Sequence, residues 1–248
     1  RRSHPAAECR GSRQRSLNRL ALAVRPAYPA GMDKRPPEKP IAMELRESAD
    51  EKLYSPSAAR NSALIAEVLS PVLPSDASVL EIGSGTGEHG EAVCGIRPDI
   101  QWTPSDPDEL SRRSQAARAR ETSGLKAPLE LDVSSAGWTQ DLPAFDALVC
   151  CNVIHISPWA AAEGLARGTA DILGPEGRIF LYGPFLEGAD TAPSNLEFDA
   201  SLKARNPQWG VRALQDVTQL FEQNGFHLEK RTAMPANNLS LIFSRAQR

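Results

Sequence analysis

The stretch Glu81-Ile-Gly83-Ser-Gly85-Thr-Gly87 decides the fold of this chain. It follows a short apolar segment, Val79 and Leu80, and it leads into a helical pattern. Because glycine has no Cβ atom, three glycines at alternate positions let the backbone pass close to a ligand. A strand, a glycine-rich turn and a helix in this order predict the first βα turn of a doubly wound sheet. Such folds bind nucleotide-like ligands at this turn.

The acidic residue at the start of the stretch narrows the choice of ligand. The carboxylate of Glu81 suits the cationic amino acid end of S-adenosylmethionine (SAM), whereas it would repel a pyrophosphate. The spacing E-x-G-x-G-x-G is typical of class I SAM-dependent methyltransferases. We therefore expect SAM, with S-adenosylhomocysteine (SAH) as the product, to bind at Glu81, Gly83, Ser84, Gly85 and Gly87.

Two alternatives to a SAM site remain open at this turn. A nicotinamide-dependent oxidoreductase would carry the spacing G-x-G-x-x-G. Here the third glycine, Gly87, comes one residue too early, although Gly90 leaves a stretched variant. The other alternative is a glycine-rich turn that binds no ligand.

Apolar segments and helical patterns alternate through the rest of the chain, which is typical of a single α/β domain. The apolar run at residues 147–154 is typical of a central strand that is covered on both faces. We predict a doubly wound, mostly parallel, Rossmann-like sheet of seven strands, with an antiparallel strand at the C-terminal end. The predicted strands are residues 79–81, 100–103, 129–133, 147–154, 178–182, 226–231 and 239–244.

Acidic residues also end the second and third predicted strands. Asp106 follows the second strand, where a carboxylate can accept hydrogen bonds from both ribose hydroxyls. Asp132 ends the third strand and is placed to accept from the adenine amino group, while the backbone of Val133 donates to the ring. An ordinary turn aspartate is the alternative for Asp106, because Pro104 and Pro107 flank it.

The segment after the fourth predicted strand is where the methyl group and its acceptor meet in class I folds. Asn152 is placed to orient an acceptor and to contact the cofactor, and His155 to act as a general base. The alternative for His155 is a core histidine bonded to the backbone. His89, in the first turn after the glycines, is equally open to a structural or a functional interpretation.

Several motifs with polar residues are spread over residues 54–245, outside the glycine turn. They are Ser57-Ala-Ala-Arg60-Asn61, Glu88-His89, Trp102-x-Pro104-Ser-Asp106, Leu131-Asp132-Val133, Asn152-x-x-His155-Ile-x-Pro158, Tyr182-Gly-Pro184-Phe185, Pro193-Ser-Asn195-x-x-Phe198-Asp199, Arg205-Asn-Pro207-x-Trp209-Gly210-x-Arg212 and Met234-Pro-Ala-Asn237-Asn238. In this order the motifs resemble the methyltransferase-like protein 26 family. The resemblance implies a class I SAM-dependent methyltransferase fold. Residues that match the family motifs in the C-terminal half are substrate-site candidates, or they tie a long loop to the sheet.

The resemblance supplies the remaining candidate site residues. Arg60 is placed to meet the carboxylate of SAM, or else it lies on an exposed helix face. We expect the segment that follows the fifth strand to form the acceptor wall. The substrate-binding candidates are Tyr182, Asp199, Arg205, Arg212 and Asn237.

These observations predict a SAM-dependent methyltransferase that acts on a small molecule. Because the sulfonium is already electrophilic, in-line alignment and exclusion of water supply much of the rate. The alternative is a SAM-binding or interaction protein that keeps the fold and transfers nothing. The domain from residue 43 to residue 248 would carry this activity.

Residues 1–42 differ in composition from that domain. Residues 1–31 hold seven arginines and a single acid, Glu8, for a net charge of +6. The whole chain carries −3, which leaves −9 on the rest, and an acidic body argues against nucleic acid as a partner. The extension is typical of a mitochondrial or plastid transit peptide, or it precedes an initiator at Met32 or Met43. We expect a cytoplasmic protein, or an organellar one if residues 1–42 are a transit peptide.

Membrane insertion and metal binding are not expected. The longest apolar stretch, residues 147–156, is too short to span a bilayer. The four cysteines are too few and too badly spaced for a disulfide framework or a zinc site. Cys150 and Cys151 are adjacent in a predicted strand, so their side chains should face opposite sides of the sheet.

Overall fold

The computed structural model describes residues 47–49 and 51–246, and the predicted extension at residues 1–42 lies outside that range. Its strands are β1 (Glu47–Ala49), β2 (Lys52–Tyr54), β3 (Ser78–Ile82), β4 (Gln101–Ser105), β5 (Phe145–Cys151), β6 (Leu173–Pro184), β7 (Phe226–Met234) and β8 (Asn238–Arg245). Its α-helices are α1 (Pro56–Leu69), α2 (Glu88–Ile96), α3 (Glu109–Ala119), α4 (Trp159–Ile172), α5 (Pro193–Arg205) and α6 (Leu214–Gln223). Short 3₁₀ turns are η1 (Ser70–Val72), η2 (Val153–His155), η3 (Gly188–Asp190) and η4 (Pro235–Asn237).

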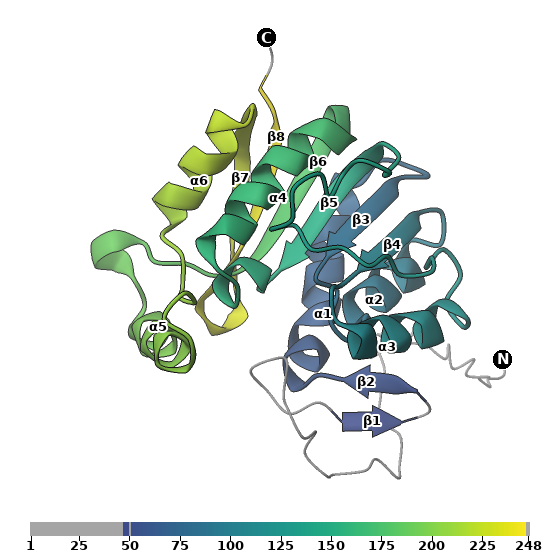
Figure 1. The fold of residues 1–248 in the computed structure, drawn as a ribbon, viewed down its shortest axis with the longest axis horizontal. Helices are drawn as coiled ribbons and strands as arrows, with labels where there is room; N and C mark the ends of the chain where they lie inside the picture. Colours follow the sequence, from purple (N-terminus) through teal and green to yellow (C-terminus); the bar gives the residue numbers. More distant parts are fainter. Residues whose placement is uncertain (1–46, 50, 247–248) are drawn as a thin grey trace, which may run out of the picture. The chain divides into compact units, whose positions relative to one another are not determined.

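The main sheet has the strand order β4-β3-β5-β6-β8-β7 (Figure 1). The strands β4, β3, β5 and β6 pair in parallel, whereas β8 runs antiparallel to both β6 and β7. The predicted α/β class, the mostly parallel sheet and the antiparallel strand at the C-terminal end are confirmed. The carboxyl ends of β3, β4, β5 and β6 therefore lie at one edge, where ligands bind in open α/β sheets.

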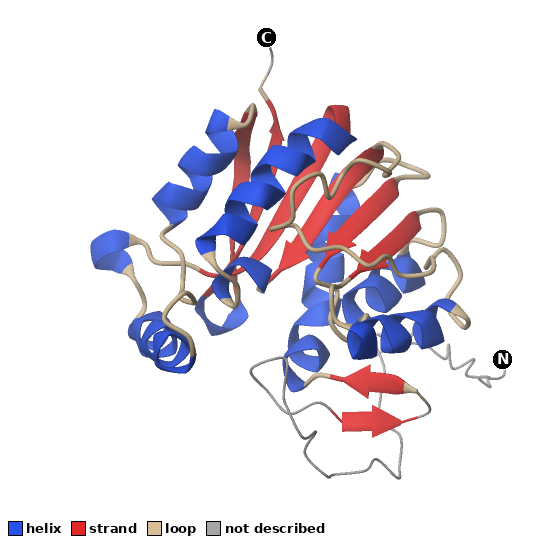
Figure 2. Ribbon diagram, in the orientation of Figure 1, coloured by secondary structure: helices blue, strands red, loops and turns tan. Residues whose placement is uncertain are grey.

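Helices cover both faces of this sheet (Figure 2). Side chains alternate along β5, so that Leu148 packs in one hydrophobic cluster with α4 and α6, and Val149 packs in another with α1 and α2. Cys150 and Cys151 belong to different clusters, which confirms that they face opposite sides. A strand with apolar residues on both faces needs such cover, and this explains the continuous apolar run of β5.

The predicted strand at residues 129–133 does not form, so the main sheet has six strands instead of seven. Leu129 makes an isolated parallel bridge to Ser105, and its N–H donates to the carbonyl of Pro104 at 2.9 Å. The carbonyl of Leu129 accepts from the N–H of Asp106 at 3.1 Å, but β4 ends at Ser105, so residues 130–133 have no neighbouring strand with which to continue a ladder. The segment still runs beside the end of β4.

The expectation of a long loop after the fifth strand was also wrong, because part of that segment is the helix α5. Its first residue, Pro193, suits the first helical position, and Leu202 is its buried apolar contact. Within the described range, no helix combines the length and the apolar character needed to cross a bilayer.

Candidate functional site

The glycine turn, residues 83–87, follows β3 and has a backbone that only glycine adopts easily. The φ angles of Gly83, Gly85 and Gly87 are +63°, +54° and +85°. A Cβ atom added to Gly83 would lie 2.4 Å from a methyl group of Val153. The turn therefore approaches the segment after β5 more closely than any other residue type allows.

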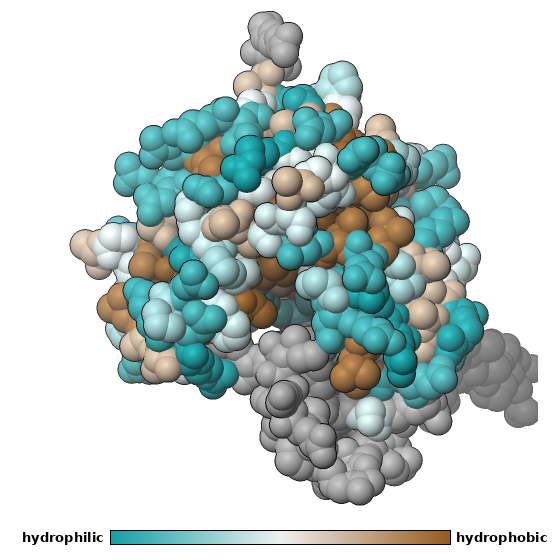
Figure 3. All heavy atoms as spheres, in the orientation of Figure 1, coloured by the Kyte–Doolittle hydropathy of each residue, from teal (hydrophilic) through white to brown (hydrophobic). Residues whose placement is uncertain are grey.

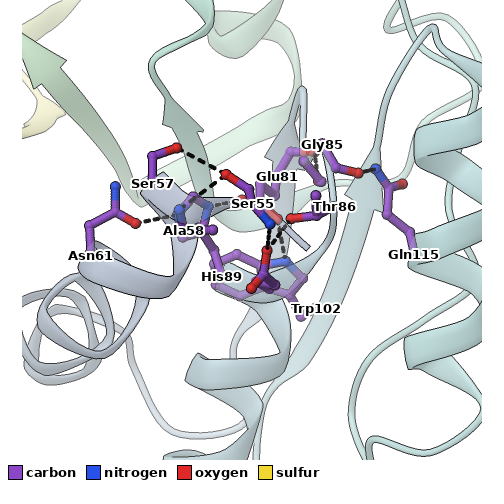
Figure 4. A network of polar contacts seen from close by, with 12 residues as sticks. Ser55, Ser57, Ala58, Asn61, Glu81, Gly85, Thr86, His89, Trp102 and Gln115 are labelled. Atoms are coloured by element: carbon purple, nitrogen blue, oxygen red, sulfur yellow. Dashed lines mark hydrogen bonds and ion pairs between the residues drawn. The ribbon is translucent and has the colours of Figure 1, made fainter. Parts of the chain in front are cut away.

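Asp106 anchors this turn from the end of β4. One of its carboxylate oxygens accepts from the N–H of Gly85 at 2.9 Å, and the other accepts from the N–H of Asp108 at 2.9 Å. On the other side of the turn, the carbonyl of Gly85 accepts from the side chain of Gln115 at 2.9 Å (Figure 4). The structure thus brings together the glycine turn and the predicted ribose-binding acid, and adds Gln115, which sequence reasoning missed.

Glu81 is directed into the protein and not out of the turn. Only 1% of the residue is exposed, and its carboxylate accepts from the indole N–H of Trp102 at 3.1 Å (Figure 4). Its other oxygen lies 3.3 Å from Nδ1 of His89. Through these contacts Glu81 links β3 to Trp102 and His89. Its predicted contact with the amino group of SAM stays a prediction.

A polar chain continues from His89 to the end of β6. Nε2 of His89 lies 3.1 Å from Oδ1 of Asn61 on α1. The side chains of Asn61 and Asn238 also interact with the hydroxyl of Tyr182, and both interactions act to lower its pKa. Burial raises the pKa of Tyr182, so its hydroxyl keeps its proton. Asn61, and not the exposed neighbour Arg60, makes the contacts that join α1 to the glycine turn and the sheet.

Glu88 adds a further link between the turn and α1. Its carboxylate accepts from the backbone N–H of Ser55 at 2.8 Å and from the hydroxyl of Thr86 at 2.7 Å. Burial raises the pKa of Glu88, and its two hydrogen bonds partly oppose that rise. Ser55 is the N-cap of α1, so the start of this helix is tied to the glycine turn.

Asp132 and Val133 lie in the irregular segment beside β4. Val133 is buried, whereas Asp132 is exposed. An oxygen of Asp132 accepts from the backbone N–H of Ser134 at 2.9 Å and from its hydroxyl at 2.5 Å. This is a local turn contact, and the predicted contacts of both residues with adenine stay predictions.

Glu81, His89 and Cys151 place one potential metal ligand each within 4.8 Å of one another. Burial raises the pKa of the Cys151 thiol well above its ordinary value, whereas a metal ligand must be a thiolate. Glu81 and His89 are also partners of each other, so we assign no metal to this group.

Asn152 follows β5 in the left-handed conformation, with φ +63°, and its N–H donates to the carbonyl of Tyr182 at 2.8 Å. His155, three residues later, is 1% exposed. Its Nδ1 accepts from the N–H of Arg212 at 3.3 Å, so its proton is on Nε2. Burial, followed by the charge of Arg212, lowers the pKa of His155 to about 3. These contacts favour the core-histidine interpretation of His155, and its role as a base stays a prediction.

Replacing His155 with glutamine should flatten the dependence of stability on pH. In the unfolded chain this histidine takes up a proton near pH 6.5, whereas in the folded chain it does so only near its pKa of about 3. Stability therefore falls as the pH drops from 6.5 towards 3. Urea unfolding between pH 4 and 7.5 should show a slope that is smaller in His155→Gln by close to one proton. Parallel curves for the two proteins would contradict the assignment.

Arg212 and Asp199 hold the segment before α6 in place. The guanidinium of Arg212 donates to the carbonyls of Ile154 at 2.9 Å and Ser157 at 2.6 Å. The carboxylate of Asp199 accepts from the N–H of Val211 at 2.9 Å. Burial lowers the pKa of Arg212, and Asp199 opposes that effect. Both contacts agree with the tying interpretation.

The other three predicted substrate-binding residues lie in different parts of the structure. Asn237 in η4 donates to the hydroxyl of Ser194 at 2.8 Å, which ties η4 to α5. Arg205 is exposed at the end of α5. Tyr182, by contrast, is buried beside the polar chain that reaches the glycine turn. Of the five candidates, Tyr182 is thus the one joined by side-chain contacts to that chain.

Two open cavities lie away from the glycine turn. The larger, about 850 Å³, is lined by η3, α6 and neighbouring residues, and the smaller, about 390 Å³, by residues that include Trp159 and Arg212. None of the predicted cofactor residues lines either cavity. On the face drawn in Figure 3, the surface is also hollowed between α5 and α3, near the end of β5, and apolar side chains line part of this hollow.

Comparison with known proteins places residues 52–245 in one family model, described as "Protein of unknown function (DUF938)". Solved structures share the fold. CalO1, a methyltransferase in calicheamicin biosynthesis solved with bound SAH, is 18% identical with a TM-score of 0.63, and the alignment covers 77% of this chain and 54% of CalO1.

Two further solved structures have a similar fold. Human N-acetylserotonin methyltransferase, in complex with SAM, is 16% identical with a TM-score of 0.62, and 77% of this chain and 53% of that chain are covered. An O-methyltransferase family protein from Burkholderia thailandensis is 12% identical with a TM-score of 0.63, with 77% and 60% covered. The chain therefore spans little more than half the length of these proteins. The likeness shows that this chain shares the Rossmann-like fold of these proteins.

Proposed function

The chain belongs to the family described as "Protein of unknown function (DUF938)", and on the geometry of its glycine turn we propose that it is a SAM-dependent methyltransferase. The observation that carries the proposal is the turn of three left-handed glycines whose central N–H is held by Asp106. The neighbours of similar fold include one with bound SAH and one with bound SAM, which supports the choice of cofactor.

The residues present fit this cofactor. At Gly83 a Cβ atom would clash with a methyl group of Val153, so only glycine lets the turn pack this closely on the segment after β5, where the methyl group and its acceptor would meet. Asp106 places a carboxylate beside the central N–H of the glycine turn, at the carboxyl end of β4, where it would accept from the ribose hydroxyls. Asp132 and Val133, beside the end of β4, would contact the adenine.

The proposed mechanism asks for alignment more than for acid or base catalysis. SAM supplies a methyl group on an electrophilic sulfonium. The glycine turn and Asp106 fix the position of the donor, and Asn152 and Tyr182 at the ends of β5 and β6 orient a small-molecule acceptor for in-line displacement. His155, with a pKa of about 3 and with its unprotonated Nδ1 accepting from the backbone N–H of Arg212, is a weak base, so it would assist only an acceptor that needs little help to lose its proton.

A non-catalytic SAM-binding or interaction protein is the second candidate. Two predicted substrate-binding residues favour this candidate, because Arg212 and Asp199 bond backbone groups of the protein itself. Labelled SAM and metabolite extracts separate the two candidates. A labelled product from the wild type that is lost in Asp106→Ala supports an enzyme, and binding without any product supports the alternative.

Finer assignments complete the proposal. The family motifs suggest a relationship to the methyltransferase-like protein 26 family. Residues 43–248 would form the methyltransferase-like domain, and residues 1–42 an extension. We propose a small-molecule acceptor, since the acidic body disfavours nucleic acid, and a cytoplasmic location unless the extension directs the chain to an organelle.

Calorimetry with SAM and SAH tests the shared claim of a cofactor site. Gly85→Arg should abolish binding, because φ of +54° is strained for arginine and the side chain fills the turn. Gly95→Arg is the matched control, since Gly95 is exposed on α2 and an added Cβ meets nothing within 4 Å. Wild-type protein that binds neither compound, or a Gly85→Arg variant with unchanged affinity, would overturn the proposed site.

A further inference from the structure

The helix α3 joins the glycine turn to the hairpin formed by β1 and β2, which lies next to it (Figure 1). Ser114 on α3 makes both contacts with a single hydroxyl. Its oxygen accepts from the N–H of Leu53 in β2 at 2.8 Å, and its hydrogen is donated to the carbonyl of Thr86 in the turn at 2.8 Å.

Arg118, one helical turn after Ser114, makes the same two connections. It is 1% exposed, and its Nε donates to the carbonyl of Thr86 at 2.9 Å. One terminal nitrogen donates to the carbonyl of Leu53 at 2.7 Å, and the other pairs with Glu91 on α2. The guanidinium also lies 4.8 Å from the centre of the Tyr54 ring.

These bonds form a closed ring that runs from Leu53 through Ser114 to Thr86 and back through Arg118. A guanidinium is planar, with its donors at fixed angles, and a buried one must keep those donors paired. If the hairpin moves, Arg118 must turn, and the carbonyl of Thr86 loses a partner. The position of the hairpin and the shape of the glycine turn are therefore coupled.

We propose that Arg118 is a positioning residue that couples docking of the β1–β2 hairpin to the shape of the glycine turn, so that the hairpin raises ligand affinity. Arg118 acts through Thr86, and the inference rests on the proposed function for the identity of the ligand. Because coupling between two equilibria is reciprocal, ligand binding must also shift the equilibrium between the docked and the open hairpin towards the docked form by the same factor.

A double-mutant cycle on the affinity for SAH tests the coupling. Tyr54→Leu removes the ring that stacks on Arg118, and Arg118→Met removes the donors while it keeps part of the apolar stem. We expect Tyr54→Leu to weaken SAH binding about 3- to 10-fold in the wild-type background, and to have no effect in Arg118→Met. Equal effects in both backgrounds, or none in the wild type, would overturn the inference.

Matched variants separate positioning from loss of the fold. Arg113→Met removes an exposed arginine of α3 that pairs with Glu109 in the same helix, and it should leave the affinity unchanged. If Arg118→Met does not fold, Arg118→Lys takes its place in the cycle, because lysine keeps the charge but lacks the planar group that bonds the carbonyls of Thr86 and Leu53 together. All affinities are compared at a temperature at which circular dichroism shows each variant folded.

Hydrogen exchange gives a readout that a merely stabilising contact would not move. SAH should slow exchange of the backbone amides of residues 51–55 in the wild type, and should not slow it in Arg118→Met. Equal slowing in both proteins would contradict the inference. Failure of the wild type to bind SAH would instead sink the proposed function, so the two failures are distinguishable.

Discussion

Replacing Asp106 with alanine is expected to weaken the affinity for SAH by about 100-fold. The substitution removes the proposed acceptor of the two ribose hydroxyls and releases the N–H of Gly85, which donates to Asp106 at 2.9 Å. Hydrogen bonds to a charged group contribute about 1.5–3 kcal/mol each, and about 1.4 kcal/mol corresponds to a factor of ten. Two such bonds account for the expected loss, which calorimetry with SAH measures directly.

Asp108→Ala is the matched control for this variant. Asp108 lies two residues away and caps α3, where it accepts from the N–H of Ser111 at 2.8 Å. Its loss removes the same charge and costs about 1 kcal/mol of stability, but it takes no group from the proposed ribose site. We expect Asp108→Ala to bind SAH nearly as the wild type does. Equal affinities of the two variants would show that Asp106 does not hold the ligand.

Replacing Gly164 with alanine should lower the free energy of unfolding by about 1–3 kcal/mol. Gly164 lies inside α4, and an added Cβ would lie 1.9 Å from the carbonyl oxygen of Val133. That neighbour is backbone and cannot rotate away, so the segment after β4 would have to shift. The better helix propensity of alanine returns only about 1 kcal/mol. Urea unfolding measures the net loss.

The same substitution at Gly95 provides the comparison. Gly95 lies in α2, is exposed, and an added Cβ there meets nothing within 4 Å. Gly95→Ala should therefore raise stability by up to about 1 kcal/mol, through helix propensity alone. A Gly164→Ala variant that is as stable as Gly95→Ala would refute the close packing of α4 on Val133.

The elements that the sequence predicted best are those with strong local patterns. The strand before the glycine turn, the apolar β5 and the terminal strand pair all form, because hydrophobic period and turn residues agree there. The strand at residues 129–133 does not form, since β4 ends at Ser105 and leaves the residues after Leu129 without a neighbouring strand to pair with. The helix α5 was missed because few of its residues are apolar, and contacts such as Asn195 to the carbonyl of Phe185 hold it in place.

The contacts of the candidate site also fall into those that local sequence patterns predicted and those that they did not. The glycine spacing and the acid after the second strand were sufficient to bring Gly85 and Asp106 together as a prediction, because parallel strands end at one edge. The partners of Glu81 and His155 were not predictable. Trp102 lies 21 residues from Glu81 along the chain, and Arg212 lies 57 residues from His155.

By itself, the sequence determined the class of fold, the edge of the sheet that carries the site and the turn at its centre, since these follow from local periodicity and from the freedom of glycine. Only the tertiary structure decided what each polar side chain does there. It turned Glu81 inward to Trp102, buried His155 as a neutral group and joined the β1–β2 hairpin to the glycine turn through Arg118. The physical reason is that hydrogen bonds and burial depend on residues far apart in the chain, which no local pattern specifies.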